Sequence, residues 1–186
     1  MRLKLAVFGL IILLASFAAC EREDDARAVS GAAWAAKLAS LIPAVGHRNW
    51  IVVADSAFPL QISPGIETIV TNEDHFAVLD KVLKAVDATR HVRPKIWLDK
   101  ELAFVAEDLA PGADAARRRL AEALQGRTAA PALHGDLIAR LDAAGRMFKI
   151  VMLKTTLTVP YTSVFLELDC GYWGPEAEVK LREKMK

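Results

Sequence analysis

The chain has 186 residues, with 24 basic and 23 acidic side chains and a formal net charge of +1. This length suffices for one domain with a sizeable hydrophobic core. The balanced charge and the lack of a basic helical stripe argue against a nucleic-acid-binding protein.

The amino terminus has the pattern of a targeting segment. Arg2 and Lys4 precede an apolar run, Leu5 to Ala19, which is shorter than the roughly 18–20 residues needed to span a bilayer. Phe17 to Cys20 resembles a lipoprotein cleavage box, although such boxes usually carry leucine where Phe17 stands. The resemblance implies cleavage before Cys20 and a lipid on its sulfur. An uncleaved anchor and an ordinary secretory signal are the alternatives.

We therefore divide the chain into a lipoprotein signal peptide (1–19), a charged tether (20–29) and one folded domain (30–186). The mature protein is expected to be exported and held by its lipid on the periplasmic side of a membrane or on the cell surface. There are only two cysteines. If Cys20 carries the lipid, Cys170 has no partner for an intrachain disulfide. We interpret Cys170 as a buried small apolar residue rather than a nucleophile.

Apolar periodicity predicts helices that alternate with strands. The first helix begins at Ser30 as its cap and ends at Pro43, with Trp34 and Leu38 on its apolar face. The predicted strands are 50–54, 66–70, 94–98, 148–153 and 164–168. The further predicted helices are 76–88 (capped by Asn72 or Asp74), 102–109, 113–124, 136–147 and 175–186, and 128–131 is expected to be a loop. This alternation indicates a layered α/β domain.

Polar residues next to the strands are the candidates for chemistry, because ligands of such sheets bind beyond strand ends. His47 and Asp55 flank the strand 50–54. A strand rises about 3.3 Å per residue, so these two side chains lie at its opposite ends. They either serve different sites or meet through a neighbouring subunit. We interpret His75 and His91 as structural.

Several cofactor signatures are missing from the sequence. It has no nucleophile elbow, no glycine-rich phosphate loop, no dinucleotide fingerprint and no zinc-like spacing of cysteine and histidine. We therefore expect neither a metal nor an organic cofactor.

Two segments resemble the RbsD/FucU family, the ribose pyranases and fucose mutarotases. Residues 46–59 match the family's Gly-His pair, apolar strand and Asp-Ala/Ser-x-x-Pro, with the family's interval from His47 to Asp55. Residues 160–166 resemble its Tyr-x-Asn and the aliphatic strand that follows. The resemblance covers roughly 47–171. It implies a three-layer α/β/α domain with a mixed central sheet, and a ring-shaped homo-oligomer, commonly a decamer, with sites at subunit contacts.

The resemblance also assigns roles. His47 matches the family's proton-donating histidine, and Asp55 matches its sugar-binding aspartate. Tyr161 and Ser163 match the tyrosine and asparagine that bind sugar hydroxyls. Ser163 departs from the family, since it offers one short hydroxyl in place of an amide, so the preferred sugar is expected to differ.

The implied function is cofactor-free interconversion of cyclic forms of a monosaccharide by acid–base catalysis. Histidine, with a reference pKa of about 6.5, suits proton transfer in both directions near neutral pH. The family also uses a histidine or arginine before the late helix, for which His134 is the candidate and Asp136 the alternative. A non-catalytic carbohydrate-binding lipoprotein with the same fold is the second hypothesis, and an α/β domain with chance similarity is the third.

Overall fold

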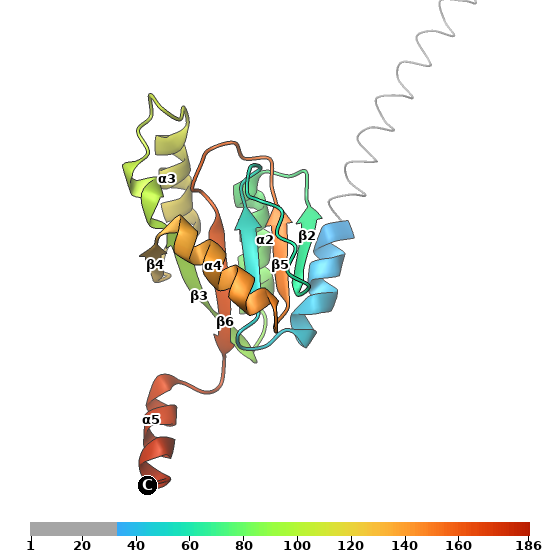
Figure 1. The fold of residues 1–186 in the computed structure, drawn as a ribbon, viewed down its shortest axis with the longest axis vertical. Helices are drawn as coiled ribbons and strands as arrows, with labels where there is room; N and C mark the ends of the chain where they lie inside the picture. Colours follow the sequence, from blue (N-terminus) through green and yellow to red (C-terminus); the bar gives the residue numbers. More distant parts are fainter. Residues whose placement is uncertain (1–32) are drawn as a thin grey trace, which may run out of the picture.

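The computed structural model describes residues 33–186 as a six-stranded sheet with helices on both faces (Figure 1). The strands are β1 (Trp50–Ala54), β2 (Ile66–Val70), β3 (Val92–Asp99), β4 (Ala129–Ala132), β5 (Ile150–Lys154) and β6 (Val164–Cys170). A helix over residues 33–41 is followed by η1 (Ile42–Ala44), α2 (His75–Asp87), η2 (Lys100–Phe104), α3 (Ala113–Ala123), α4 (His134–Gly145) and α5 (Pro175–Lys184).

The predictions for the signal peptide 1–19, the lipid on Cys20, the tether 20–29 and the Ser30 cap lie outside the described residues. Within residues 33–186, no helix has the length and apolar content that a membrane span requires.

The strand order is β2-β5-β1-β6-β3-β4. In this part of the chain five strands run parallel, and β6 runs antiparallel between β1 and β3. The ends of the five parallel strands therefore lie at the same edge of the sheet as the start of β6. We call this edge the carboxyl edge.

Two hydrophobic cores lie on the two faces of the sheet. Successive side chains of a strand point to opposite faces, so Ile51 and Val53 pack under the helix 33–41, α2 and α3. Trp50 and Val52 pack under α4 instead. All residues of β1 are buried, as expected for an inner strand covered on both faces. The three-layer α/β/α arrangement with a mixed sheet is confirmed.

Asp74 is the cap of α2, which decides between the two predicted candidates. Its carboxylate accepts hydrogen bonds from the backbone N–H groups of Phe76 and Ala77, both at 3.1 Å. Arg119 of α3 pairs with the same carboxylate and lies with its guanidinium 4.1 Å from the Phe76 ring centre. Arg119 therefore links α3 to α2.

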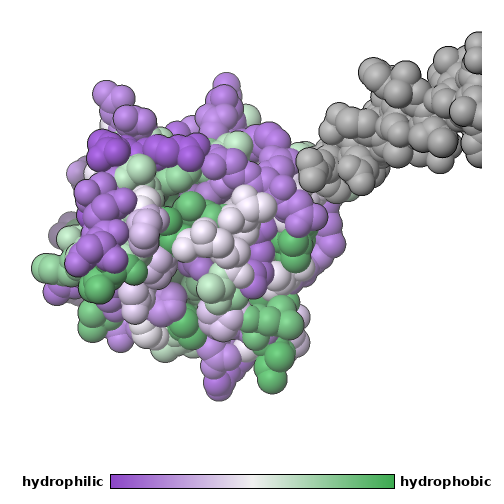
Figure 2. Space-filling view, turned by 90° about the horizontal axis from the view of Figure 1, so that it is seen from above, coloured by the Kyte–Doolittle hydropathy of each residue, from purple (hydrophilic) through white to green (hydrophobic). Residues whose placement is uncertain are grey.

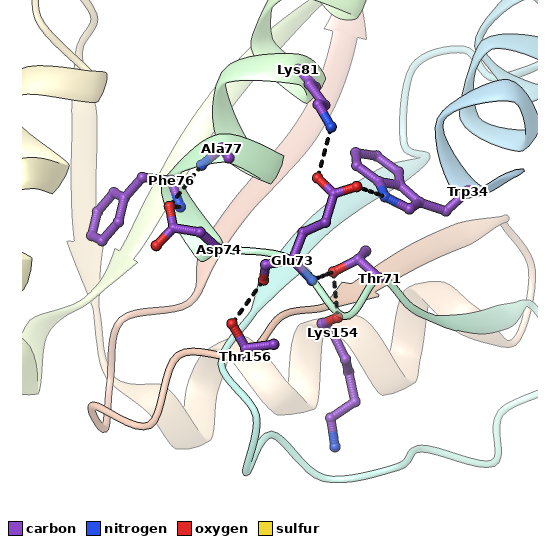
Figure 3. A network of polar contacts seen from close by, with 9 residues as sticks. All are labelled: Trp34, Thr71, Glu73, Asp74, Phe76, Ala77, Lys81, Lys154 and Thr156. Carbon is purple, nitrogen blue, oxygen red and sulfur yellow. Dashed lines mark hydrogen bonds and ion pairs between the residues drawn. The ribbon is translucent and has the colours of Figure 1, made fainter. Parts of the chain in front are cut away.

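Glu73 ties the first helix to the sheet (Figure 3). Its carboxylate accepts hydrogen bonds from Trp34 Nε1 at 2.9 Å and from Lys81 Nζ at 2.7 Å. Its carbonyl accepts one from the Thr156 hydroxyl at 3.0 Å. These bonds join the helix 33–41, α2 and the segment after β5, and they hold the loop after β2 in place.

The prediction of a helix over 102–109 is wrong. The chain forms the short η2 and then turns, because neighbouring side chains take up the backbone groups. The Arg117 guanidinium donates to the carbonyls of Leu102 at 2.9 Å and Val105 at 2.7 Å. The Glu107 carboxylate accepts from backbone N–H groups at the start of α3.

The prediction of a loop over 128–131 is also wrong, because Ala129–Ala132 forms β4. Alanine and proline have low strand propensity, but the segment pairs in parallel with the residues from Ile96 to Asp99 of β3. Pro131, which donates no backbone hydrogen bond, is tolerated because β4 is an edge strand.

The end of the chain also departs from expectation. Cys170, at the end of β6, is only partly buried, whereas the sequence predicted a buried residue.

The helix α5 forms as predicted but has no buried residue. It projects from the edge of the sheet opposite the carboxyl edge (Figure 1).

Gly65 provides a test of this packing. A Cβ atom at Gly65 would lie 2.2 Å from the carbonyl oxygen of Phe148 and 2.5 Å from that of Gly145. Because backbone atoms cannot move aside easily, Gly65→Ala is expected to lower the free energy of unfolding by about 2–4 kcal/mol. Urea denaturation followed by circular dichroism measures this change.

The matched control is Gly135→Ala in the first turn of α4, where no neighbouring atom lies within 4 Å of the new Cβ. It is expected to leave stability unchanged or to raise it by up to about 1 kcal/mol. Equal stability of the two variants would contradict the close approach at Gly65.

Candidate active site

The buried polar side chains of residues 33–186 all lie at the carboxyl edge. They come from the segments after β1, β2, β3 and β5 and from the segment before β6, and they are Asp55, Thr71, His75, Asp99, Thr155, Thr162 and Ser163. Figure 2 looks down on the molecule from above this edge and shows apolar patches between polar groups. Burying polar groups costs free energy, so their concentration in one place makes this edge the candidate functional site.

Asp55 and Ser163 form the first pair at this edge. The Ser163 hydroxyl donates to Asp55 Oδ2 at 2.9 Å and accepts from the Asp55 backbone N–H at 3.1 Å. The other carboxylate oxygen of Asp55 accepts from the Ala57 N–H at 2.9 Å. Both oxygens of this carboxylate therefore have a donor, and its orientation is set by the chain itself.

Asp99 and His134 form the second pair. His134 begins α4, and its Nδ1 lies 3.0 Å from Oδ1 of Asp99, the last residue of β3. The backbone N–H of His134 donates to both oxygens of the Glu101 carboxylate, at 3.0 and 3.1 Å. The His134 ring lies edge-to-face against Phe58, with 5.7 Å between centres, and against Tyr161, at 5.4 Å.

Burial changes the electrostatics of Asp99. Its side chain has no exposed surface, and its Oδ2 has no hydrogen-bond partner among the described residues. This burial raises the pKa of the Asp99 carboxyl to about 6, against the opposing hydrogen bond from His134. The negative charges of Glu101 and Asp55 raise the pKa further. Asp55 is thus close enough to influence the second pair electrostatically.

His75 is the third polar group in this region. Its Nδ1 lies 3.0 Å from the Thr155 hydroxyl, which is 2.8 Å from the Ala54 carbonyl. Since a carbonyl only accepts, the hydroxyl donates to it, and Nδ1 of His75 carries the proton. Nε2 of His75 is buried and has no partner among the described residues. Burial lowers the pKa of His75 to about 4, so its ring is neutral at pH 7.

The structure brings four of the five predicted sugar-site residues to one edge. Asp55 and Ser163 are hydrogen-bonded, and the rings of His134 and Tyr161 are in contact. Tyr161 has a left-handed backbone, with φ of 61°. Asp136, the alternative to His134, is exposed on α4.

His47 lies at the opposite edge of the sheet, before β1, as the length of that strand requires. There it lines a cavity of about 480 Å³ with Asp169, Tyr172 and Trp173, beside the start of α5. Within one chain, His47 and Asp55 therefore do not share a site, and a site that uses both needs a second copy of the chain.

Sequence reasoning missed Asp99 and did not place His75 in this region. Asp99 is the last residue of β3, and Asp55 directly follows β1. A position at the end of a strand could therefore have pointed to Asp99 as it pointed to Asp55. His75 lies directly after the cap of α2, a place where a histidine is usually structural. Only the packing of α2 on the sheet brings it to Thr155.

The chain matches no protein-family model and no curated protein. Among solved structures it is similar to RbsD from Bacillus subtilis complexed with D-ribose, with 14% sequence identity over 72% of this chain and 91% of that chain, at a TM-score of 0.50. It is also similar to FucU from Bifidobacterium longum, with 15% identity over 72% and 93% of the two chains, at a TM-score of 0.45. The similarity to RbsD confirms the RbsD-like fold.

The pKa shifts of His75 and Asp99 predict opposite effects of pH on stability. The lowered pKa of His75 means that the unfolded chain binds its proton more tightly, so this residue reduces stability as pH falls from about 6.5 to 4. The raised pKa of Asp99 means that the folded chain binds its proton more tightly, so this residue adds stability as pH falls from about 6 to 4. Each contribution is at most about 3 kcal/mol.

Asp99→Asn is therefore expected to make the loss of stability between pH 6.5 and 4 steeper, and His75→Gln to make it shallower. Urea denaturation at pH 4, 5, 6 and 7 measures both slopes. Identical slopes in the two variants and the unaltered chain would show that neither group titrates as described.

Proposed function

We propose that this protein interconverts cyclic forms of a monosaccharide, either pyranose and furanose or the two anomers, without a cofactor. The observation that supports this most directly is the concentration of buried polar side chains at the carboxyl edge. Ligands of open α/β sheets bind beyond the carboxyl ends of the strands. The fold is that of RbsD, a protein whose solved structure holds D-ribose.

The proposed reaction needs proton transfer and orientation only. Ring opening passes through the open-chain aldehyde, so one group takes the proton of the anomeric hydroxyl and the ring oxygen receives one. General acid–base help contributes roughly 10²- to 10⁴-fold, which is enough for a reaction that already proceeds unaided. Asp55, oriented by the Ser163 hydroxyl, supplies an acceptor for a sugar hydroxyl, and Tyr161 supplies a phenol.

We also propose that the protein acts as a homo-oligomer. Large apolar side chains are exposed near the carboxyl edge, with Phe104 at 78% and Leu109 at 82% exposure. Both line a cavity of about 400 Å³ together with Glu101 and Tyr161. A second copy seated there would remove apolar surface from water. If that copy presents its own His47, the site gains the residue that lies too far away within one chain.

A carbohydrate-binding protein without turnover is the second candidate. It is favoured by the pairing of Asp55 with Ser163, because both carboxylate oxygens already have a donor within the chain. Such a site holds hydroxyl groups but is less free to exchange protons with them.

Exchange NMR on the purified chain with a panel of small aldoses, ribose and fucose included, separates these candidates. We expect faster exchange between ring forms of at least one sugar. Asp55→Asn is expected to lower kcat/KM for exchange by about 10- to 100-fold, because it removes a charged hydrogen-bond acceptor. The control is Asp136→Asn, an exposed aspartate on α4, which is expected to leave the rate unchanged.

Sugar binding without faster exchange would favour the second candidate. Neither binding nor exchange with any sugar of the panel would remove the proposed function and leave the fold unaffected.

We further propose that Cys20 carries a lipid that anchors the exported protein. Metabolic labelling of expressing bacterial cells with an alkyne fatty acid tests this. Label is expected on the unaltered chain and on Cys170→Ser, and it is expected to be lost in Cys20→Ser. Label that survives Cys20→Ser would contradict the proposed anchor.

A further inference from the structure

We infer that His134 transfers the proton in this site and that Asp99 is its positioning residue, an inference that rests on the proposed function. The family resemblance gives the proton-donating role to His47 and makes His134 only a substrate-binding candidate. Within one chain, however, His134 lies at the carboxyl edge and His47 does not.

The two ring nitrogens of His134 have different surroundings. Nδ1 is bonded to Asp99, whereas Nε2 makes no hydrogen bond within residues 33–186. The His134 side chain is 26% exposed, so the ring is accessible while its other side is held by the protein. Nε2 is therefore the atom available to a substrate.

The ring is held in one orientation by several contacts. The Glu101 carboxylate fixes the backbone N–H of His134, and the Phe58 and Tyr161 rings pack against the imidazole. Such preorganisation is what a proton-transfer group needs, since the reacting atoms must be aligned before reaction.

Asp99 has the features of a partner for a charged imidazole. Its side chain has no exposed surface, and one carboxylate oxygen lacks a partner among the described residues. A buried carboxyl with an unmatched oxygen is costly in a purely structural role. The cost is offset when the imidazole gains a proton, because the carboxylate then faces a positive charge.

The other two polar groups of this edge are less suited to the role. His75 has no exposed surface and cannot touch a substrate. Both carboxylate oxygens of Asp55 already accept hydrogen bonds from the chain. His134 combines an accessible ring nitrogen with a fixed carboxylate behind it.

The proton-transfer step conserves atoms and charge. Nε2 of neutral His134 takes the proton of the anomeric hydroxyl, and the electron pair of that O–H bond forms the carbonyl double bond at C1. The bond from C1 to the ring oxygen breaks, and its electron pair stays on the ring oxygen. The imidazolium, paired with Asp99, then gives its proton to that oxygen. Ring closure reverses these steps with the same oxygen or with another hydroxyl of the sugar.

The test compares His134→Gln, Asp99→Asn and His47→Gln in the exchange NMR assay, using the sugar that the unaltered chain turns over. His134→Gln is expected to lower kcat by about 10²-fold or more. Asp99→Asn is expected to lower kcat by about 10-fold, with KM within about 3-fold, and to move the acidic limb of the pH–rate profile. A purely structural role for Asp99 would not move that limb.

NMR of the His134 ring adds a readout that does not depend on turnover. The Nδ1–H signal, which reports the hydrogen bond to Asp99, is expected to move or disappear in Asp99→Asn and to stay unchanged in Asp136→Asn. Circular dichroism checks the folding of each variant. If Asp99→Asn fails to fold, His134→Gln decides alone, because its side chain is partly exposed.

If His134→Gln keeps its turnover and only raises KM, the inference is overturned and the proposed function stands. The same holds if His47→Gln loses turnover while His134→Gln keeps it. Absence of exchange in the unaltered chain would remove the proposed function, and the proton-transfer role of His134 with it. The two failures are therefore distinguishable.

Discussion

The insertion of β6 antiparallel between β1 and β3 is the constraint on which the carboxyl edge depends. Because β6 starts where β1 and β3 end, Ser163 meets Asp55 although the two residues are 108 positions apart. Tyr161 reaches the His134 ring through the same segment. If β6 ran parallel to its neighbours, this segment would lie at the other edge of the sheet, near His47. The direction of a single strand therefore assembles the candidate site.

The buried polar side chains lie at the carboxyl edge, so the free-energy cost of burying them also arises there. His75 and Asp99 are both buried, and burial disfavours the charged form of each, so the pKa of the histidine falls and that of the carboxyl rises. Their effects on stability have opposite signs between pH 4 and 6 and partly offset each other. Each also has one nitrogen or oxygen without a partner in the described residues. Unmatched buried atoms of this kind are uncommon in folded proteins.

Local patterns in the sequence predict elements well where one face must be buried. The residues Phe76, Leu79 and Val86 define α2 by their spacing, and all are buried in the structure. Predictions fail where a distant partner decides the local conformation. The segment Ala129–Ala132 becomes a strand because β3 pairs with it. The segment after β3 does not continue as a helix, because the Arg117 guanidinium donates hydrogen bonds to its carbonyl groups.

The sequence by itself determined the alternation of strands and helices, and the resemblance of two short segments pointed to Asp55, Tyr161 and Ser163. Periodicity and short motifs are local properties, so they can be read without knowing what packs against what. Only the tertiary structure decided that His47 lies at the opposite edge and that Asp99 holds His134, a contact across 35 residues. That contact depends on which strands are neighbours and in which direction each runs, and no local pattern encodes strand order.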